Sequence, residues 1–459
     1  MGSKWKTSFL TDHYIISSGL SKPAKDFGTG YPFLSFKDIF YNYFLPDSLT
    51  QLVQSTEKER ATCSVKRGDV FLTRTSETMH ELGMSSVALK DYANATFNGF
   101  CKRLRPKEKS ELEPEYVGYY LRSPLFRQNM LAFSTMSTRA SLNNEMISRL
   151  EISYPDRNLQ KKIANILLSL DKKSAILKTI NQTLEQMSQT LFKSWFVDFD
   201  PVVDNALDAG NPIPEALQSR AELRQKVRNS ADFKPLPAEI RSLFPSEFEE
   251  TELGWMPKGW QIKSLDHIAN FQNGLALQKF RPKNMEDDYL PVLKIADLRA
   301  GQITNDERAR TDISDSCKVY DGDMIFSWSG TLMIDIWTGG NAALNQHLYK
   351  VTSKKYPQSF YFMWTKQHLS RFQHIAEAKA VTMGHIKKGD LSNSFCLIPT
   401  SSLITKYDNI VGGYLAKIKN QRLLNNQMTA LRDTLLPKLI SGELSLDDLP
   451  DLNTDTEAA

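Results

Sequence analysis

Residues 158–196 read NLQKKIANILLSLDKKSAILKTINQTLEQMSQTLFKSWF and contain no proline and no glycine. Apolar residues recur at every seventh position, at Ile163, Leu170, Leu177, Leu184 and Leu191. A second row begins three residues further on and holds Ile166, Lys173, Ile180, Met187 and Ser194. Rows at the a and d positions of a heptad predict a long helix that packs against another helix, with two polar residues in its d row. At about 1.5 Å per residue, this helix would be roughly 60 Å long.

The partner helix is expected in the same chain, because residues 402–440 repeat the pattern. Three apolar pairs stand 244 residues apart: Ile180 with Leu424, Leu184 with Met428, and Leu191 with Leu435. Pro437 should kink or end this second helix. An alternative interpretation is that the two stretches are unrelated amphipathic core helices, but the match extends well beyond them.

The repeat also covers the segments that precede each helix. Residues 31–39 (YPFLSFKDI) match residues 290–298 (LPVLKIADL), and residues 67–74 (RGDVFLTR) match residues 321–328 (DGDMIFSW). Each of these four segments has the pattern of a short buried strand next to a turn. The chain is therefore expected to contain two similar α/β domains, a mixed α+β architecture, joined by two long helices.

These observations predict six segments, in this order: a first α/β domain at residues 1–155, a central helix at 156–200, a connector at 201–255, a second α/β domain at 256–400, a C-terminal helix at 401–445, and an acidic tail at 446–459. With 459 residues, the chain is too long for one hydrophobic core.

Composition narrows the class of protein. The 57 basic and 53 acidic residues leave a net charge of +4, which permits a nucleic-acid partner without requiring one. No apolar run approaches the roughly 20 residues that span a bilayer, and the N-terminus does not resemble a signal peptide. The four cysteines are widely scattered, so we expect reduced thiols and a cytoplasmic protein.

Motifs for catalysis are missing from the sequence. Gly28-Thr29-Gly30 lacks the strand, loop and helix of a nucleotide site, and no G-x-x-x-x-G-K-[ST] occurs. We therefore expect no catalytic residue, no cofactor and no metal in this chain.

Duplication points instead to DNA, whose two strands are themselves related by local two-fold axes. Base edges are read by polar side chains on loops, and phosphates by cations. The candidates in the first half are Arg74, Thr75, Ser76, Thr138, Arg139 and Ser141, and those in the second half are Trp328, Ser329, Lys379, Thr382, His385 and Lys387. A denser basic run that could hold phosphates contains Lys102, Arg103 and Arg105.

Several segments resemble the DNA specificity subunit of Type I restriction-modification systems. They are residues 192–201 (FKSWFVDFDP), 256–260 (MPKGW) and 435–444 (LLPKLISGEL). The resemblance covers nearly the whole chain. It implies two target-recognition domains that bind the halves of a split DNA sequence, and an antiparallel pair of helices that sets the gap between the halves.

The same resemblance implies the partners. They are double-stranded DNA, two copies of an adenine-N6 methyltransferase subunit and, where restriction occurs, two ATP-dependent motor–nuclease subunits. S-adenosylmethionine, ATP and Mg²⁺ would be bound by those subunits, which agrees with the motifs missing here. The sequence leaves two alternatives open: a specificity chain of another methyltransferase-based phage-defence complex, and a coiled-coil protein scaffold that does not read DNA.

Overall fold

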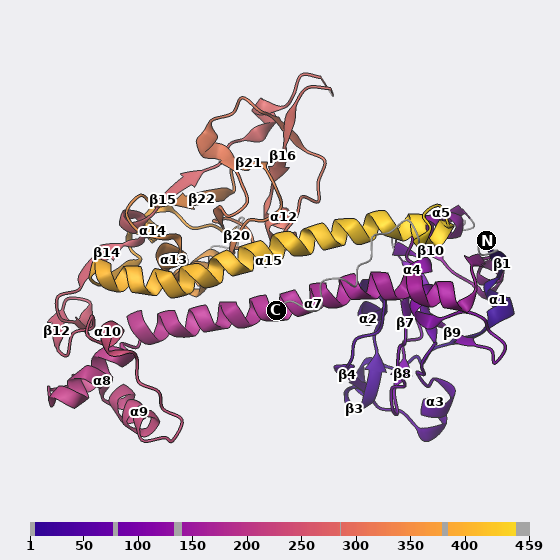
Figure 1. Cartoon of the computed structure of the whole chain (residues 1–459), viewed down its shortest axis with the longest axis horizontal. Coiled ribbons are helices and arrows are strands. Elements are labelled where there is room, and N and C mark those ends of the chain that lie inside the picture. Colours follow the sequence, from indigo (N-terminus) through magenta and orange to yellow (C-terminus); the bar gives the residue numbers. More distant parts are fainter. Residues whose placement is uncertain (1–4, 77–80, 133–139, 285, 379–383, 447–459) are drawn as a thin grey trace. The chain divides into compact units, whose positions relative to one another are not determined.

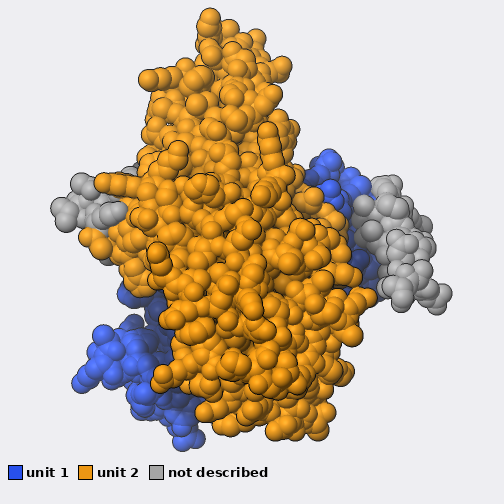
Figure 2. Space-filling view, turned by 90° about the vertical axis from the view of Figure 1, so that its left-hand side faces the viewer, with its two compact units in different colours: residues 1–174, 427–459 blue, residues 175–426 orange. Residues whose placement is uncertain are grey.

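A computed structural model describes residues 5–76, 81–132, 140–284, 286–378 and 384–446 (Figure 1). The chain divides into two compact units, one of residues 1–174 and 427–459 and the other of residues 175–426 (Figure 2). Each unit contains one mixed α/β domain and a part of each of the two long helices. No helix of the described chain is long and apolar enough to cross a membrane.

The long helices are α7 (Arg157–Phe196) and α15 (Ser401–Ser441). In the first unit, Asp171 near the start of α7 accepts a hydrogen bond from Arg432 near the end of α15 (2.8 Å). In the second unit, Glu185 of α7 accepts from Arg422 of α15 (2.9 Å). As residue numbers rise along one helix, they fall along the other. The two helices therefore run antiparallel, as the family resemblance implied.

The seam between the helices differs in one respect from the heptad pattern expected. The first row is at the interface, where Ile163 and Leu184 are buried. The second buried row lies four residues after it, not three, and contains Leu167, Asn181, Ser188 and Trp195 on α7 and Val411, Ile418 and Leu439 on α15. The predicted d row was wrong, since Met187 and Leu424 are 46% and 47% exposed. Positions three and four residues along a helix both neighbour the first row, so periodicity alone does not separate them.

The end of α15 also differs from one of the expected outcomes. The helix does not stop at Pro437 but continues to Ser441. Gly442 follows it with φ of 74°, the left-handed conformation that commonly terminates helices.

In the first unit, a four-stranded sheet has the order β2-β9-β5-β7 and a three-stranded sheet the order β4-β3-β8, while β1 pairs with β11 and β6 with β10. The strands are β1 (Lys6–Phe9), β2 (Tyr14–Ser18), β3 (Phe27–Leu34), β4 (Gln51–Val53), β5 (Val70–Thr73), β6 (Thr75–Ser76), β7 (Ser85–Val87), β8 (Thr96–Phe97), β9 (Cys101–Pro106), β10 (Ala140–Ser141) and β11 (Glu151–Tyr154). The shorter helices are α1 (Leu10–His13), η1 (Ala24–Asp26), α2 (Phe36–Tyr41), α3 (Glu57–Thr62), α4 (Pro114–Tyr120), α5 (Pro124–Ala132) and α6 (Asn144–Ser148).

The second unit repeats the first sheet as β15-β22-β19-β20 and the pairing of β1 with β11 as β14 with β23; its other sheet has a fourth strand, in the order β17-β16-β21-β18, and β12 pairs with β13. Its strands are β12 (Phe248–Thr251), β13 (Gly254–Pro257), β14 (Gln261–Ser264), β15 (Asn270–Asn273), β16 (Tyr289–Leu293), β17 (Arg308–Arg310), β18 (Lys318–Val319), β19 (Met324–Ser327), β20 (Ile334–Ile336), β21 (Ala342–Leu344), β22 (Leu348–Thr352) and β23 (Phe395–Ile398). Its shorter helices are α8 (Asp200–Ala209), η3 (Glu215–Leu217), α9 (Gln218–Arg228), α10 (Ala238–Arg241), α11 (Leu265–Ile268), η4 (Leu277–Phe280), α12 (Ile295–Ala300), η5 (Asp315–Cys317), α13 (Gln358–Glu377) and α14 (Lys388–Ser392).

Alternating side chains of the central strand in each domain enter two different cores. In β5, Val70 and Leu72 enter one core and Phe71 the other. In β19, Met324 and Phe326 enter one core and Ile325 the other. Successive side chains of a strand point to opposite faces of its sheet, so both faces of these sheets are covered. The first of the two cores in each unit also takes in residues of the long helices.

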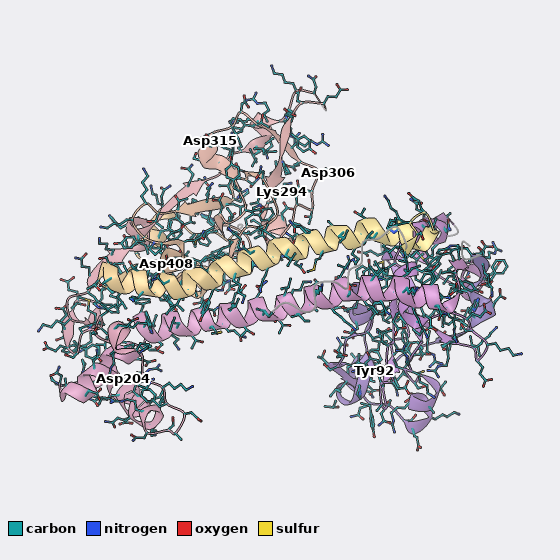
Figure 3. The ribbon with its side chains drawn as sticks, in the orientation of Figure 1. Tyr92, Asp204, Lys294, Asp306, Asp315 and Asp408 are labelled. Atoms are coloured by element: carbon teal, nitrogen blue, oxygen red, sulfur yellow. The ribbon has the colours of Figure 1, made fainter. Side chains whose placement is uncertain are left out.

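The segment expected as a connector is a helical hairpin over part of its length. Three arginines of α9 pair with three aspartates of α8, each pair 20 residues apart: Arg220 with Asp200, Arg224 with Asp204, and Arg228 with Asp208. Asp204 is labelled in Figure 3. Both sets repeat every four residues, which places each on one face of its helix. The aspartates of α8 are thus neutralised by arginines of the same hairpin.

Candidate nucleic-acid interface

Two residues predicted to contact DNA occupy equivalent places in the two domains. Arg74 directly follows β5, and its backbone N–H donates to the carbonyl oxygen of Phe100 (2.8 Å). Trp328 directly follows β19, and its N–H donates to the carbonyl oxygen of His347 (3.3 Å). The strands before them share one register, since Thr73 faces Cys101 and Ser327 faces Leu348.

Polar loops far apart in sequence meet beside these positions. Ser141 pairs with Thr75 in the first domain, and His385 pairs with Ser329 in the second. The carbonyl oxygen of Arg74 accepts a hydrogen bond from Leu142 (2.7 Å), and that of Trp328 accepts one from Ile386 (3.1 Å). In each domain, the structure thus joins the two loops that the sequence offered separately as candidates.

A tight turn completes the arrangement in both domains. The side-chain oxygen of Asn98 accepts from the N–H of Phe100 (2.8 Å), and that of Asn345 accepts from the N–H of His347 (3.1 Å). Gly19 and Gly274 lie against these turns, where a Cβ atom would overlap the carbonyl oxygens of the two asparagines. Glycine is needed at both positions because the backbones approach so closely.

We call the side chains of Ser18, Arg74, Thr75, Phe100, Lys102 and Ser141 the first cluster. It is cationic: Lys102 is 8% exposed and its ammonium donates to the hydroxyl of Ser18 (2.9 Å). Burial and the nearby charge of Arg74 lower the pKa of Lys102. Arg74 is exposed, and its guanidinium has no hydrogen-bond or ion-pair partner in the described part of the chain. Phe100 is 64% exposed beside it.

The second cluster contains the side chains at the equivalent positions: Asn273, Trp328, Ser329, His347, Tyr349 and His385. It is aromatic. The indole N–H of Trp328 donates to the amide oxygen of Asn273 (3.1 Å), and the ring lies 5.8 Å from that of Tyr349 and 6.0 Å from that of His347. The hydroxyl of Ser329 lies 3.0 Å from Nδ1 of His347. The same backbone framework thus carries different chemistry in each domain.

Arg103 and Arg105 are bound within the first domain. Arg105 makes a bidentate ion pair with the fully buried Asp69 (2.8 and 2.6 Å), and Arg103 donates to the carbonyl oxygen of Ser64 (2.6 Å). The second domain has a related contact, in which Lys350 pairs with Asp323 (2.7 Å). Arg105 and Lys350 hold the Gly-Asp turn of each repeat in place, and Arg103 is bound to main-chain oxygens, so we do not include these cations in the proposed DNA surface.

Thr138, Arg139, Lys379 and Thr382 lie outside the described residues, as does the side chain of Ser76. Lys387 is exposed two residues after His385, where its N–H donates to the carboxylate of Asp390 (2.7 Å) at the start of α14.

Sequence reasoning missed five members of the clusters: Ser18, Asn273, Phe100, His347 and Tyr349. The repeat offers a signal for four of them, because residues 15–19 (IISSG) match 270–274 (NFQNG) and residues 97–100 (FNGF) match 344–347 (LNQH), which sets Ser18 opposite Asn273 and Phe100 opposite His347. Each pair stands next to matched Gly or Asn positions but differs in side chain. Residues that differ inside a matched framework mark where two copies have acquired different contacts.

Among the described residues, no group of His, Cys, Asp and Glu is arranged to hold a metal ion. The four cysteines are buried and unpaired. Burial raises the pKa of the Cys101 thiol to about 12. That thiol is therefore a poor nucleophile.

The model of the Type I restriction modification DNA specificity domain matches residues 2–186 and again residues 257–401. The chain belongs to this family. The two matched ranges each contain one of the repeated domains, so this specificity chain carries both modules in a single polypeptide.

Relatives extend over the full length of the specificity chain. It is 26% identical to the Type I restriction enzyme HindI specificity subunit of Haemophilus influenzae over 96% of this chain and 100% of the relative. It is 24% identical to the MjaIX specificity subunit of Methanocaldococcus jannaschii over 97% of this chain and 94% of the relative. The crystal structure of the S subunit from M. genitalium shares its fold, with a TM-score of 0.52 and 12% identity over 95% of this chain and 96% of that one.

Proposed function

We propose that this specificity chain reads a split DNA sequence, one half with each cluster, and holds adenine-N6 methyltransferase subunits over it. One observation carries the proposal: two backbone frameworks with corresponding hydrogen bonds display different side chains at equivalent positions. A scaffold that bound two copies of one protein would need similar surfaces twice. A reader of an asymmetric sequence needs one framework with two different sets of contacts.

The antiparallel helices would set the gap between the half-sites. Each recognition domain directly precedes one long helix in sequence, and α7 and α15 have nearly equal lengths of 40 and 41 residues. Every residue adds about 1.5 Å to a helix, and every base pair adds about 3.4 Å to a duplex. Removing one heptad from both helices would therefore shorten the span by roughly three base pairs, while the a row keeps its register.

Matched deletions test this role. Residues 172–178 of α7 and 424–430 of α15 lie between the pairs Asp171–Arg432 and Glu185–Arg422, so both ion pairs remain. The double deletion should shorten the gap in the methylated motif by about three base pairs without changing either half-site. An unchanged gap would contradict the role of the helices as a spacer. Deletion from α7 alone is the control and should abolish recognition.

The helices also offer equivalent surfaces for two methyltransferase copies. Met187 of α7 is 46% exposed and Leu431 of α15 is 45% exposed, and they stand at matching positions of the two repeats. One belongs to each unit. Met187→Lys and Leu431→Lys should each remove one methyltransferase copy in native mass spectrometry, and the double variant should remove both. Exposed Leu223 of α9, which is 47% exposed, supplies the matched control.

The chain itself would perform no chemistry. S-adenosylmethionine would be bound by the methyltransferase subunits, and ATP and Mg²⁺ by motor–nuclease subunits where these join. The methyltransferase would then rotate the selected adenine out of the duplex into its own pocket. Purified chain alone should methylate and cleave nothing.

Mapping of methylated adenines tests the proposal as a whole. The chain is expressed with its methyltransferase subunit in a methylation-free host, whose genome is then sequenced with modification detection. A bipartite motif with different half-sites is expected. A continuous motif, or methylation without sequence preference, would overturn the proposal, and no DNA binding by the complex would favour a protein scaffold.

A further inference from the structure

Positions 74 and 328 are equivalent in backbone geometry and opposite in chemistry, since one carries a cation and the other an aromatic ring. We infer that these are base-reading positions: Arg74 recognises a guanine in the first half-site, and Trp328 recognises the methyl group of a thymine in the second. The inference rests on the proposed function and assigns specific bases within it.

The surroundings of Arg74 favour guanine. Its main chain is fixed on both sides, by hydrogen bonds to Phe100 and Leu142, while its guanidinium is exposed and has no partner among the described residues. Guanine presents two acceptors, O6 and N7, in the major groove, and an arginine fork binds both. Adenine replaces O6 with an amino donor. With the charge of Lys102 nearby, an amino donor at this position would face two cations.

Lys102 is not itself the reading residue. Its ammonium is buried and donates to the hydroxyl of Ser18, so it lies behind the surface that Arg74 presents. Its charge instead makes the local potential more positive, which strengthens the preference of this cluster for a base edge that carries only acceptors.

The surroundings of Trp328 favour an apolar contact. The single donor of the indole is occupied, because Nε1–H binds the amide oxygen of Asn273. The neighbouring His347 ring has Nδ1 3.0 Å from Ser329 and Nε2 3.3 Å from Gln346. The half-buried indole is therefore left with carbon surface to offer. In the major groove, thymine alone of the four bases carries a methyl group.

Base analogues test the two assignments atom by atom. The chain is assembled with its methyltransferase subunits, and Kd is measured on duplexes that carry the mapped motif. Replacing the guanine by 7-deazaguanine removes only the N7 acceptor and should weaken wild-type binding roughly 5-fold. Replacing the thymine by deoxyuridine removes only the methyl group and should weaken it roughly 4-fold.

Variants complete two double-mutant cycles. Arg74→Ala should bind guanine and 7-deazaguanine equally, and should lose about 10- to 100-fold in discrimination at that one position. Trp328→Ala should bind thymine and deoxyuridine equally. Trp328→Phe, which keeps an apolar ring, should retain part of the methyl effect, so misfolding of the alanine variant would not hide the result.

Surface residues of the same types serve as controls. Arg149→Ala removes an exposed arginine paired with Glu145, and Trp255→Ala removes a tryptophan that is 39% exposed on β13. Neither should alter base preference. A bipartite motif without guanine in the first half-site, or an analogue effect that persists in Arg74→Ala, would overturn the assignment of Arg74. Persistence of the methyl effect in Trp328→Ala would overturn that of Trp328. A complex without any bipartite motif would instead refute the proposed function itself.

Discussion

The two recognition domains share the strand order and register of one four-stranded sheet and the backbone hydrogen bonds that join three separate segments, yet they share almost none of the side chains displayed there. Arg74, Phe100 and Lys102 in the first domain correspond to Trp328, His347 and Tyr349 in the second. Main-chain hydrogen bonds do not depend on side-chain identity, so a framework built from them tolerates exchange of the residues that it carries. The main-chain contacts that hold each domain together are thus distinct from the side chains proposed to read DNA.

The two units also differ in how the ends of the long helices pack. Substitutions there should have the largest effect on the free energy of unfolding. In the second unit, Trp195 packs 5.9 Å from Tyr407, whereas the matching positions in the first unit hold Leu439 and Ile163, which share an aliphatic core. Trp195→Ala should lower the free energy of unfolding of the second unit by about 3–5 kcal/mol. Hydrogen exchange measured by mass spectrometry reports each unit separately.

The matched variant is Leu439→Ala, which should weaken only the first unit, by about 2–5 kcal/mol. Neither variant should alter the bases recognised. If weakening of one unit changed the sequence read by the other domain, the two modules would not be independent.

A smaller effect is expected at the Gly-Asp turns. Asp69 is fully buried in its pair with Arg105, whereas the side chain of Asp323 is 21% exposed in its pair with Lys350. Asp69→Asn should lower the stability of the first unit by about 2–3 kcal/mol, because it leaves the guanidinium without its charge partner. Asp323→Asn should cost about 1 kcal/mol, since solvent compensates for part of the loss.

These two variants also separate stability from reading. Both should preserve the recognised motif, in contrast to Arg74→Ala, which should change the motif with little loss of stability. A motif altered by Asp69→Asn would mean that the Arg103–Arg105 strand contacts DNA after all.

The smallest expected effect is on the pH dependence of stability. Burial lowers the pKa of His368, whose Nε2 lies 3.0 Å from the carbonyl oxygen of Phe395, and burial likewise lowers the pKa of His13 in the first unit. The unfolded chain then binds more protons than the folded one, so stability is fully present above a pH of about 6.5 and is lost as the pH falls through the folded pKa.

His368→Gln should therefore flatten the acid dependence of hydrogen exchange in the second unit and leave that of the first unit unchanged. His13→Gln should do the reverse. An acid dependence that the substitutions do not alter would assign it to other groups.

Much of this architecture could be predicted from sequence, because each half of the repeat can be checked against the other. The 244-residue spacing identified the helix pair, and the matched Gly-Asp strands identified the two domains. The second row of the helix interface was not predicted correctly. Met187 and Ser188 both neighbour the first row, and only packing selects Ser188 for burial. The ladder of arginines on α9 also escaped, because its aspartates lie 20 residues away, on a separate helix.

The sequence suggested which segments carry the candidate site, but not all of the residues that form it. Thr75, Ser141, Ser329 and His385 were expected on polar loops; the structure places Thr75 and Ser141 in the paired short strands β6 and β10, and Ser329 and His385 in an isolated bridge. The basic run at 102–105 shows the limit most clearly. Successive residues of a strand face opposite ways, so Lys102 lies on one face and donates to Ser18, whereas Arg103 and Arg105 share the other face and are bound within the domain.

Exchange of one domain tests the independence of the two readers most directly. Residues 1–150 are replaced by the equivalent block of a relative that recognises a different sequence, the chain is expressed with its methyltransferase subunit, and methylated adenines are mapped across the host genome. The account predicts a new first half-site, an unchanged second half-site and an unchanged gap. A motif in which both halves change, or neither does, would contradict it.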